Sequence, residues 1–385
     1  MLQLQQRRPP TGHNIEVGLV STFPPTRCGI ARFTNSLIEG MTLADEGLDF
    51  DVVRIVNESI LDGGCRLPVT MEYDPSSPVG VKAAAGHLNR RDVALINHEF
   101  GIFGPEDGSS VLDLVGLLEV PSITVLHTVV PDPTPTQRSI VQALARSTHP
   151  VVLCEAARDI LADSYDVASE DVEVIPHGAS WGPQSVNHPP RRRLITWGLL
   201  GPGKNIEQAI AAVADLDDLD PPIEYQVVGR LHPGIVRSHG YRYRRELSRL
   251  VHDLGLEDRI EFVDRYVDDA DLLGMVRNAD LVVVPYGNSD QVSSGVITEA
   301  IGAGRPMVST RFPYSEEMLG SGAGAVVDHD PSSLADGIRS LLTDSVAYRR
   351  AALAASQRSQ DLSWRSVGRR YARLIHQLAP TRATA

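Results

Sequence analysis

The stretch 285–304 contains the residues whose types and spacing are best suited to binding a ligand. It follows a short apolar run at 281–284, passes through the small residues at 293–295, and enters a helical pattern with one carboxylate, Glu299. A helix N-terminus offers free N–H groups and the positive end of the helix dipole, which together favour an anion. Glu299, about one turn into the helix, could accept hydrogen bonds from the hydroxyl groups of a ribose. The stretch therefore predicts a binding site for a nucleotide diphosphate.

A second glycine-rich turn, at 197–205, also follows an apolar run and carries Lys204 at the start of a predicted helix. A lysine in this position can neutralise a phosphate as a point charge. The turn is not a Walker motif, because no Gly-Lys-Ser/Thr follows at the required spacing. Arg230 closes the next predicted strand and could reach the same ligand. The alternative for both side chains is an ordinary solvated cation.

The turn after the first predicted strand, at 21–31, contains two prolines and places Gly29 at a helix start. Glycine at this point lets a ligand approach the backbone closely. The alternative interpretation is an ordinary strand-to-helix turn, in which glycine and proline are common.

Three histidines, His98, His127 and His177, each stand at the end of a predicted strand. Ligands of doubly wound sheets bind at the carboxyl ends of the strands, so three histidines there favour a functional role over a purely structural one. They lack the paired spacing of a zinc site, and we therefore predict no metal site.

The elements that must position these residues alternate between strand and helix along the whole chain. The strand-like runs are 15–20, 51–56, 93–97, 123–126, 151–153, 172–175, 194–197, 223–228, 259–263, 281–284, 307–309 and 325–327. The helix-like segments are 30–40, 110–118, 136–147, 155–164, 206–216, 241–254, 269–278, 294–303, 332–342, 346–359 and 364–377. This alternation predicts an α/β fold with doubly wound parallel sheets.

Composition and charge exclude several classes of protein. A chain of 385 residues with 42% hydrophobic residues is long enough for two domains, each with its own core. The net charge of -13 argues against nucleic acid as the main partner. Three widely spaced cysteines form neither a metal pattern nor a disulfide framework, which favours a reducing, cytoplasmic location.

The sequence also predicts neither a targeting signal nor a membrane-spanning helix. The polar N-terminus predicts no signal peptide. No apolar run approaches the about 20 residues of a membrane-spanning helix, so contact with the inner face of a membrane would be peripheral. A basic stretch at 237–246 could meet a membrane surface or an anionic acceptor, but its apolar continuation favours a solvated amphipathic helix.

In their order along the chain, these motifs resemble those of the family 4 (group 1) retaining glycosyltransferases of the GT-B fold. The resemblance covers about 15–377, and it rests on four motifs: Pro24-Pro25 with Cys28-Gly29-Ile30-Ala31, Val174-Ile175-Pro176-His177-Gly178, the turn from Gly198 to Lys204, and Gln291-x7-Glu299. It implies two Rossmann-like doubly wound parallel-sheet domains that face each other across a cleft. The expected parts are an N-terminal domain at 1–180, a linker at 181–193, a donor domain at 194–362, and a C-terminal helix at 363–385 that packs back on the first domain.

The resemblance also implies roles for single residues. On the donor side it assigns phosphate binding to Lys204 and the backbone of Gly29, Ser293, Ser294 and Gly295, ribose binding to Glu299, and nucleobase contact to Tyr266 and Val267. Arg230 could substitute for the family's phosphate-binding arginine, whose position Leu199 occupies here. It places Gln291 and His127 at the donor sugar, so that Lys204, Gln291 and His127 form the expected catalytic set. His98 and Glu99 would line the acceptor side.

The implied reaction is transfer of a hexose from a nucleotide-diphosphate sugar, UDP- or GDP-linked, to a carbohydrate or small-molecule hydroxyl. The family keeps the anomeric configuration and needs neither a cofactor nor a metal. Two departures bear on the donor: Leu199 replaces the family's phosphate-binding arginine, and Gln291 replaces a glutamate. They leave open a non-catalytic sugar-nucleotide-binding protein. A sugar-nucleotide epimerase or hydrolase on the same fold is a further alternative. A nicotinamide dehydrogenase is disfavoured, because no Gly-x-Gly-x-x-Gly follows the first strand.

Overall fold

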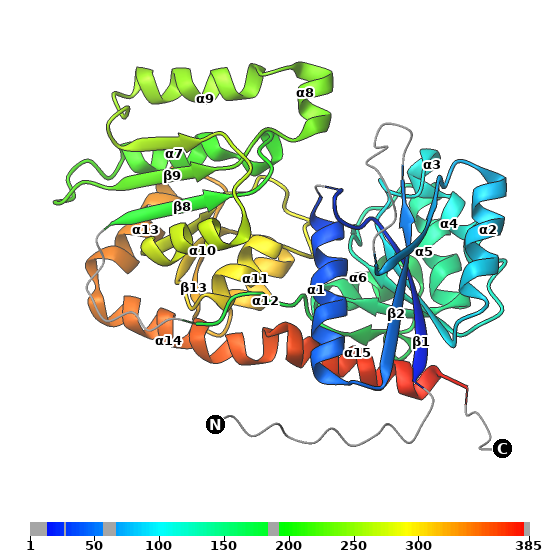
Figure 1. The fold of residues 1–385 in the computed structure, drawn as a ribbon. Helices are drawn as coiled ribbons and strands as arrows, with labels where there is room; N and C mark the ends of the chain where they lie inside the picture. The colour runs from blue at the N-terminus through cyan, green and yellow to red at the C-terminus, as the bar shows by residue number, and fades with distance from the viewer. Residues whose placement is uncertain (1–13, 27, 57–66, 184–191, 381–385) are drawn as a thin grey trace, which may run out of the picture. The chain divides into compact units, whose positions relative to one another are not determined.

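The computed structural model describes residues 14–26, 28–56, 67–183 and 192–380. The chain divides into two compact units, one made of Met1–Leu153, Arg158–Pro176 and Trp364–Ala385, the other of Cys154–Ala157 and His177–Ser363. Each unit is built on one sheet whose strands all pair in parallel, as Figure 1 shows. The predicted α/β class with two doubly wound parallel sheets is therefore confirmed. The expected linker falls mostly on 184–191, which lies outside the described residues.

The first unit contains a seven-stranded sheet in the order β3-β2-β1-β4-β5-β6-β7. Its strands are β1 (Ile15–Ser21), β2 (Leu48–Ile55), β3 (Val69–Tyr73), β4 (Val93–His98), β5 (Ser122–Leu126), β6 (His149–Val152) and β7 (Glu173–Val174). The helices are α1 (Gly29–Ala44), α2 (Pro78–Leu88), α3 (Pro105–Gly108), α4 (Ser110–Val115), α5 (Pro135–Ser147), α6 (Glu155–Tyr165), the 3-10 turn η1 (Ser169–Asp171) and α15 (Trp364–Leu378). Central strands such as β4 are buried along their whole length, which explains their continuous apolar runs.

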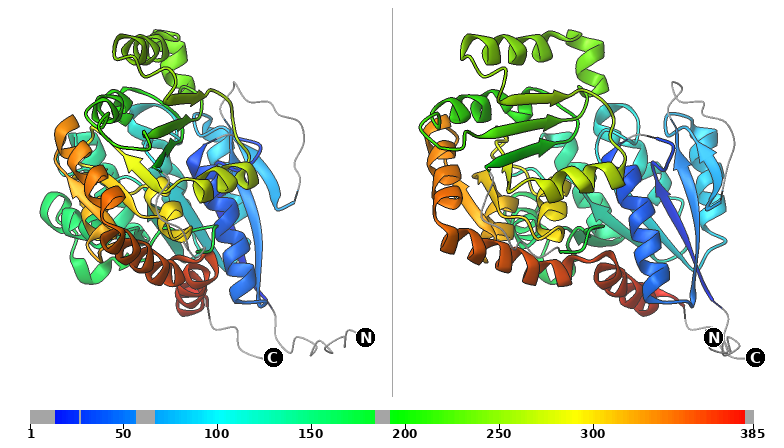
Figure 2. Two further views of the ribbon diagram at one scale, coloured as in Figure 1. Left: turned by 90° about the vertical axis from the view of Figure 1, so that its left-hand side faces the viewer. Right: turned by 60° about the vertical axis from the view of Figure 1, so that its left-hand side comes forward.

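The second unit contains a six-stranded sheet in the order β10-β9-β8-β11-β12-β13. Its strands are β8 (Arg193–Trp197), β9 (Glu224–Val228), β10 (Ile260–Val263), β11 (Leu281–Val284), β12 (Met307–Thr310) and β13 (Gly324–Val327). The helices are the 3-10 turn η2 (Pro202–Lys204), α7 (Ile206–Ala214), α8 (Pro233–His239), α9 (Arg242–Asp253), α10 (Asp269–Asn278), α11 (Gly295–Gly302), α12 (Pro313–Leu319), α13 (Pro331–Thr343) and α14 (Ser345–Leu362). In both views of Figure 2, α8 and α9 lie at the edge of this unit, beyond α7 and β9.

In both sheets the strand order reverses between two central neighbours that are far apart in the chain. These neighbours are β1 and β4 in the first sheet, and β8 and β11 in the second. Ligands of open α/β sheets bind beyond the carboxyl ends of the strands at such a switch point. The loops after these strands are therefore the places to look for a site.

Helices α1 and α15 of the first unit, blue and red in Figure 1, pack side by side through two glycines. A Cβ added at Gly40 would lie 2.3 Å from the carbonyl oxygen of Trp364, and one at Gly368 would lie 2.3 Å from the carbonyl carbon of Gly40. The two backbones therefore approach each other more closely than any larger residue allows. The last helix in the chain is in this way attached to the first.

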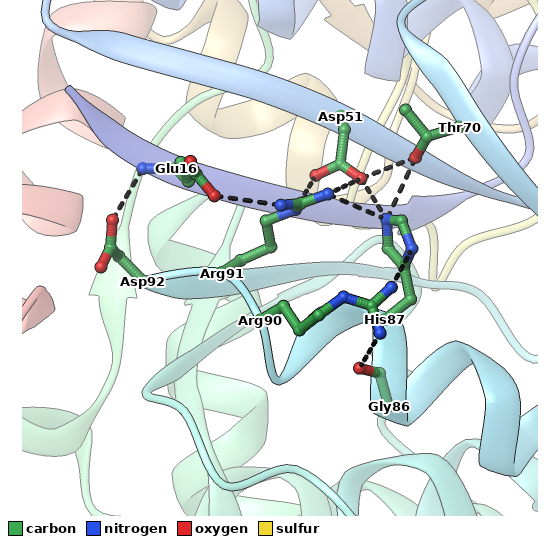
Figure 3. A network of polar contacts seen from close by, with 8 residues as sticks. All are labelled: Glu16, Asp51, Thr70, Gly86, His87, Arg90, Arg91 and Asp92. Atoms are coloured by element: carbon green, nitrogen blue, oxygen red, sulfur yellow. Dashed lines mark hydrogen bonds and ion pairs between the residues drawn. The ribbon is translucent and has the colours of Figure 1, made fainter.

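A polar network ties the first sheet to α2, as Figure 3 shows. Arg91 Nε donates to Asp51 Oδ1 at 2.8 Å, and Arg91 Nη1 donates to Glu16 Oε2 at 3.0 Å. Thr70 Oγ1 donates to Asp51 Oδ2 at 2.6 Å, and His87 Nε2 also contacts this carboxylate. Burial alone would raise the pKa of Asp51, but the hydrogen bonds from Thr70, His87 and Arg91 and the charge of Arg91 bring it below its ordinary value. Asp51 is therefore held as a carboxylate that links three strands and a helix.

Five of the described strands and α-helices, namely β3, α2, α3, α8 and α12, are not predicted by the sequence pattern. The strand β3 is an edge strand with exposed or half-buried polar positions at Thr70 and Glu72, so it lacks an apolar run. Helix α2 contains two glycines, and α8 and α12 are only seven residues long and begin at proline. Short helices of this kind carry too little periodicity to be distinguished from turns.

We predict that Gly40→Ala lowers the stability of the chain by about 2 kcal/mol or more, because the new methyl group would overlap the Trp364 backbone. Gly86→Ala is the matched control, since nothing lies within 4 Å of its added Cβ and a helical glycine gains stability on becoming alanine. Thermal unfolding of the full chain measures both. An equal melting temperature for Gly40→Ala and the wild type would show that α1 and α15 do not need this close approach.

Candidate functional site

The loops after β8 and β11 of the second unit are joined by direct contacts. Gly287 N donates to Gly203 O at 3.1 Å, which links the two loops through their backbones. Asn205 packs on the same point, since a Cβ added at Gly287 would lie 3.3 Å from Asn205 Nδ2. The turns that carry Lys204 and the stretch 285–304 therefore form one structure at the switch point of this sheet.

Lys204 lies against an aromatic ring from the neighbouring loop. Its Nζ is 3.6 Å from the centroid of the Tyr286 ring. Tyr286 is 1% exposed and stacks on Phe312, with ring centroids 5.9 Å apart and an interplanar angle of 13°. A cation over a ring face is attracted by the ring quadrupole. This contact holds the ammonium group at the loop that precedes α11, an arrangement that the sequence did not predict.

Helix α11 begins at this loop with a free end available to an anion. Ser294 is the N-cap, and its hydroxyl accepts from Ile297 N at 3.3 Å. Gly295, the first helical residue, is exposed, and the earliest N–H groups of any helix lack partners inside the helix. His177 lies beside this point, since its Nε2 is 3.7 Å from an added Cβ at Gly295. The structure thus adds His177 to the residues near the predicted diphosphate site.

Glu299 lies one turn further along α11 and is 5% exposed. Its Oε2 accepts from Ser180 N at 2.9 Å, so one oxygen supports the chain segment that enters the unit. A Cβ added at Gly302, on the same helix, would lie 2.5 Å from Ala179 Cβ. Glu299 is therefore a structural contact of this segment, and its expected role at a ribose stays a prediction.

Gln291 turns back onto its own loop, because its side-chain Nε2 donates to the carbonyl oxygen of Ser293. The same loop is also bound by Cys154, whose buried thiol donates to Val292 O at 3.2 Å. Burial raises the pKa of the Cys154 thiol to about 12, so it stays a protonated donor at neutral pH. Both contacts stiffen the approach to α11, and the predicted contact of Gln291 with a sugar stays a prediction.

The remaining donor-side candidates lie on loops of the same unit. Arg230 is exposed, and its backbone oxygen accepts from Leu200 N at 2.8 Å, so it stands next to the Lys204 turn. Val267 is 8% exposed and Tyr266 is 56% exposed in the loop after β10. The backbone of Arg230 is thus hydrogen-bonded to the residue after Leu199. The phosphate role of Arg230 and the nucleobase role of Tyr266 and Val267 stay predictions.

In the first unit, His127 follows β5 and is held from two sides. Its Nε2 lies 3.0 Å from Asn97 Oδ1, in a contact between buried side chains. The Phe33 ring packs on it edge to face, with centroids 4.5 Å apart and an interplanar angle of 85°. His127 therefore has a fixed ring orientation, which a residue that contacts a sugar would need.

His98 differs from the expectation that it lines an acceptor site. It is fully buried, stacks on Phe103 with an interplanar angle of 15°, and packs edge to face on Phe100. Neither ring nitrogen has a hydrogen-bond partner among the described residues, and burial lowers the pKa of His98 to about 4. A neutral, covered imidazole offers no contact to an acceptor unless the two phenylalanines move.

Glu99, the next residue, is half-buried and accepts from the Thr128 hydroxyl. Burial raises the pKa of Glu99 above its ordinary value, although hydrogen bonds from Thr128 and from the backbone of Phe100 and Gly101 act in the opposite direction. Gly29 is exposed as the first residue of α1, and nothing lies within 4 Å of an added Cβ there. The acceptor role of Glu99 and the phosphate role of Gly29 stay predictions.

No helix among the described residues is long and apolar enough to cross a membrane. Within the same residues, no group of three or more His, Cys, Asp or Glu side chains is arranged to hold a metal ion.

Residues 183–358 match the model of the family Glycosyl transferases group 1. This segment covers most of the second unit, including both loops of the switch point. The glycogen synthase of Mycobacterium tuberculosis is 27% identical over 237 residues, which are 58% of this chain and 53% of that protein. The chain thus spans about half the length of the curated relatives it matches.

Two solved structures share the fold over nearly the whole chain. HepE of Anabaena, in complex with UDP and glucose, aligns with a TM-score of 0.74 at 16% identity, over 95% of this chain and 100% of that one. Sucrose-phosphate synthase from Thermosynechococcus elongatus aligns with a TM-score of 0.74 at 19% identity, over 95% of this chain and 99% of that one. The fold is therefore the two-sheet GT-B arrangement of parallel, Rossmann-like units.

We predict that Tyr286→Phe keeps the stability of the chain or raises it by about 1 kcal/mol, because the buried hydroxyl has no partner among the described residues. Tyr286→Leu should lower the melting temperature clearly, since it removes both the stack on Phe312 and the ring beneath Lys204. Calorimetric unfolding of the two variants separates these effects. Equal losses in both would mean that the hydroxyl, and not the ring, supports the loop.

Proposed function

We propose that the chain is a glycosyltransferase that moves a hexose from a nucleotide-diphosphate sugar to an acceptor hydroxyl, with retention of the anomeric configuration. The observation that supports this most strongly is the joined pair of loops at the switch point of the second sheet. They hold Lys204 over Tyr286 and lead into the exposed start of α11. The family match includes both loops.

The diphosphate is the group that this arrangement fits. Lys204 supplies a positive charge, and the first N–H groups of α11 supply hydrogen-bond donors and the positive end of the helix dipole. The backbone of Arg230 accepts a hydrogen bond from Leu200, the residue after Leu199, and its side chain would supply the second cation that the leucine cannot. Glu299 would accept from the ribose, and Tyr266 and Val267 would contact the base.

In the proposed reaction, the acceptor oxygen bonds to the anomeric carbon on the face from which the diphosphate leaves. The bond between that carbon and the diphosphate oxygen breaks, and the acceptor proton passes to the leaving diphosphate. Negative charge then develops on the diphosphate, where Lys204 and the α11 N-terminus would stabilise it more than in the ground state. This scheme needs no metal and no cofactor.

The sugar and the acceptor are assigned by the resemblance. It places His127 and Gln291 at the donor sugar, and Gly29, Glu99 and His98 toward phosphate and acceptor. Of these, His127 has the fixed ring that the role requires, whereas His98 is covered. UDP is the first nucleotide to test, because HepE was solved with UDP and with UDP-glucose, and GDP is the second.

We predict that UDP binds with an affinity that Lys204→Met lowers about tenfold or more, because one charge-assisted contact to phosphate is lost. Lys82→Met is the matched control. The chain has only two lysines, and Lys82 is exposed on α2 of the other unit. Isothermal calorimetry with UDP, GDP and ADP measures the effect and the choice of base.

The titrations are repeated in excess chelator, where an unchanged affinity and an unchanged transfer rate support the metal-independent scheme. Loss of activity that added metal restores would contradict it. Binding without turnover of any nucleotide sugar would favour the non-catalytic alternative, and make Leu199 and Gln291 the first positions to change. Absence of binding by all three diphosphates would overturn the proposed donor site.

A further inference from the structure

The turn that leads from β12 into α12, residues 310–314, packs against the loop after β11 inside the second unit. Three of its side chains, those of Thr310, Phe312 and Tyr314, are at most 1% exposed. Together they contact the loop at its beginning, in its middle, and at the first turn of α11, where it ends. The turn therefore supports the whole segment that carries the candidate diphosphate site.

Thr310 binds the loop at the point where the chain leaves the sheet. Its Oγ1 donates to Tyr286 O at 2.7 Å and lies 3.2 Å from the carbonyl oxygen of Val284, the last residue of β11. Between these two carbonyl groups stands Pro285, which has no N–H and cannot extend the hydrogen-bond ladder of the strand. The Thr310 hydroxyl therefore holds the backbone on both sides of the proline, beyond the end of the ladder.

Phe312 supports the side chain of the residue whose backbone Thr310 holds. Its ring stacks on Tyr286, with centroids 5.9 Å apart. Lys204 Nζ in turn lies 3.6 Å from the centroid of the Tyr286 ring. Thr310 and Phe312 thus fix the backbone and the ring of Tyr286, and through that ring they fix the ammonium group of Lys204.

Tyr314 reaches the other part of the site, the start of α11. Its backbone N donates to Gln291 O at 3.3 Å, and its hydroxyl lies 2.6 Å from Thr298 Oγ1. Thr298 Oγ1 donates to the carbonyl oxygen of Ser294, the N-cap residue of α11, at 3.0 Å. Because a carbonyl oxygen can only accept, the single hydroxyl proton of Thr298 goes to Ser294, and the Tyr314 hydroxyl donates to Thr298. The first turn of α11 is therefore tied to the same short turn as Tyr286.

We propose that Thr310 and Tyr314 are positioning residues for diphosphate binding, with Thr310 acting through Lys204 and Tyr314 acting through the N-terminus of α11. The inference rests on the proposed function, because the diphosphate is the ligand that both features would meet. An anion bound by a cation and by helix N–H groups needs both at a fixed separation, and groups that are already in place cost no rearrangement on binding. One turn that contacts both features sets this separation.

Hydrogen exchange of the full-length protein without ligand tests whether Thr310 holds the loop. Thr310→Val keeps the branched shape of the side chain but loses the hydroxyl, so exchange of the amides at 286–297 is expected to accelerate about tenfold or more. Thr310→Ser keeps a hydroxyl and should return exchange close to the wild-type rate. Tyr348→Phe is the matched control, because the buried Tyr348 hydroxyl donates to Asp280 O at 3.0 Å, at the opposite end of β11. It should leave exchange at 286–297 unchanged.

A second experiment separates positioning from a general loss of stability. The affinity for UDP is measured by calorimetry in Thr310→Val, Tyr314→Phe, Lys204→Met and the two double variants that contain Lys204→Met. Each change in the turn alone should weaken UDP binding about fivefold to tenfold. In the Lys204→Met background, Thr310→Val should weaken binding by less than about twofold, because the lysine through which it acts is gone. Tyr314→Phe should keep its full effect there, since it acts through α11.

Unchanged exchange in folded Thr310→Val, or a loss that Thr310→Ser does not restore, would overturn the role of Thr310. Fully additive effects of Thr310→Val and Lys204→Met on UDP affinity would show that Thr310 does not act through the lysine. Unchanged UDP affinity in Tyr314→Phe would overturn the role of Tyr314. If the wild type binds none of UDP, GDP and ADP, the proposed function fails, whereas the exchange rates still decide separately whether the turn holds the loop.

Discussion

The backbone hydrogen bond from Gly287 N to Gly203 O is the contact on which the candidate site depends. It joins two loops whose strands are neighbours in the sheet but lie more than eighty residues apart in the sequence. Lys204 lies on one of these loops and Tyr286 on the other, and the two side chains are in contact. With this hydrogen bond, a cation, an aromatic ring and the start of α11 are held together before any ligand arrives. Preorganised charge of this kind costs no rearrangement during a reaction, which is why it is effective in catalysis.

Contacts from outside the two loops also hold them in place. Cys154 holds the loop from the end of β6, and Ser294 caps α11. Glu299 binds the backbone of Ser180, which fixes the segment that enters the unit. A carboxylate expected to serve a ligand therefore also serves the fold, and its substitution would test both at once. Lys204 contacts the Tyr286 ring instead, and its substitution leaves the hydrogen bonds of Glu299 and Cys154 in place.

Much of the fold could be predicted from the sequence, because parallel strands that are buried on both faces have continuous runs of apolar residues. The runs at 93–97 and 281–284 correspond closely to β4 and β11. The pattern does not predict β3, whose edge position leaves polar residues exposed, nor α12, which is short and begins at proline. Local patterns report burial and periodicity, so elements with little of either are missed.

The candidate site could be predicted in part for a related reason. Residue type and a place at a strand end were enough to select Lys204 and His127, since topology brings strand ends together. The covering of His98 by Phe100 and Phe103 depends on tertiary packing. So do the contacts of Thr310 and Tyr314 with the loop before α11 and with its first turn. Such relations are set by side-chain directions in three dimensions, which no spacing along the sequence encodes.

A modification footprint shows whether a nucleotide diphosphate binds at Lys204. The protein is treated with a limiting amount of acetic anhydride with and without saturating UDP, and acetylation of each lysine is measured by mass spectrometry. UDP is expected to protect Lys204, while Lys82, exposed on α2, reacts equally in both samples. Equal acetylation of Lys204 with and without UDP would show that the diphosphate does not bind there.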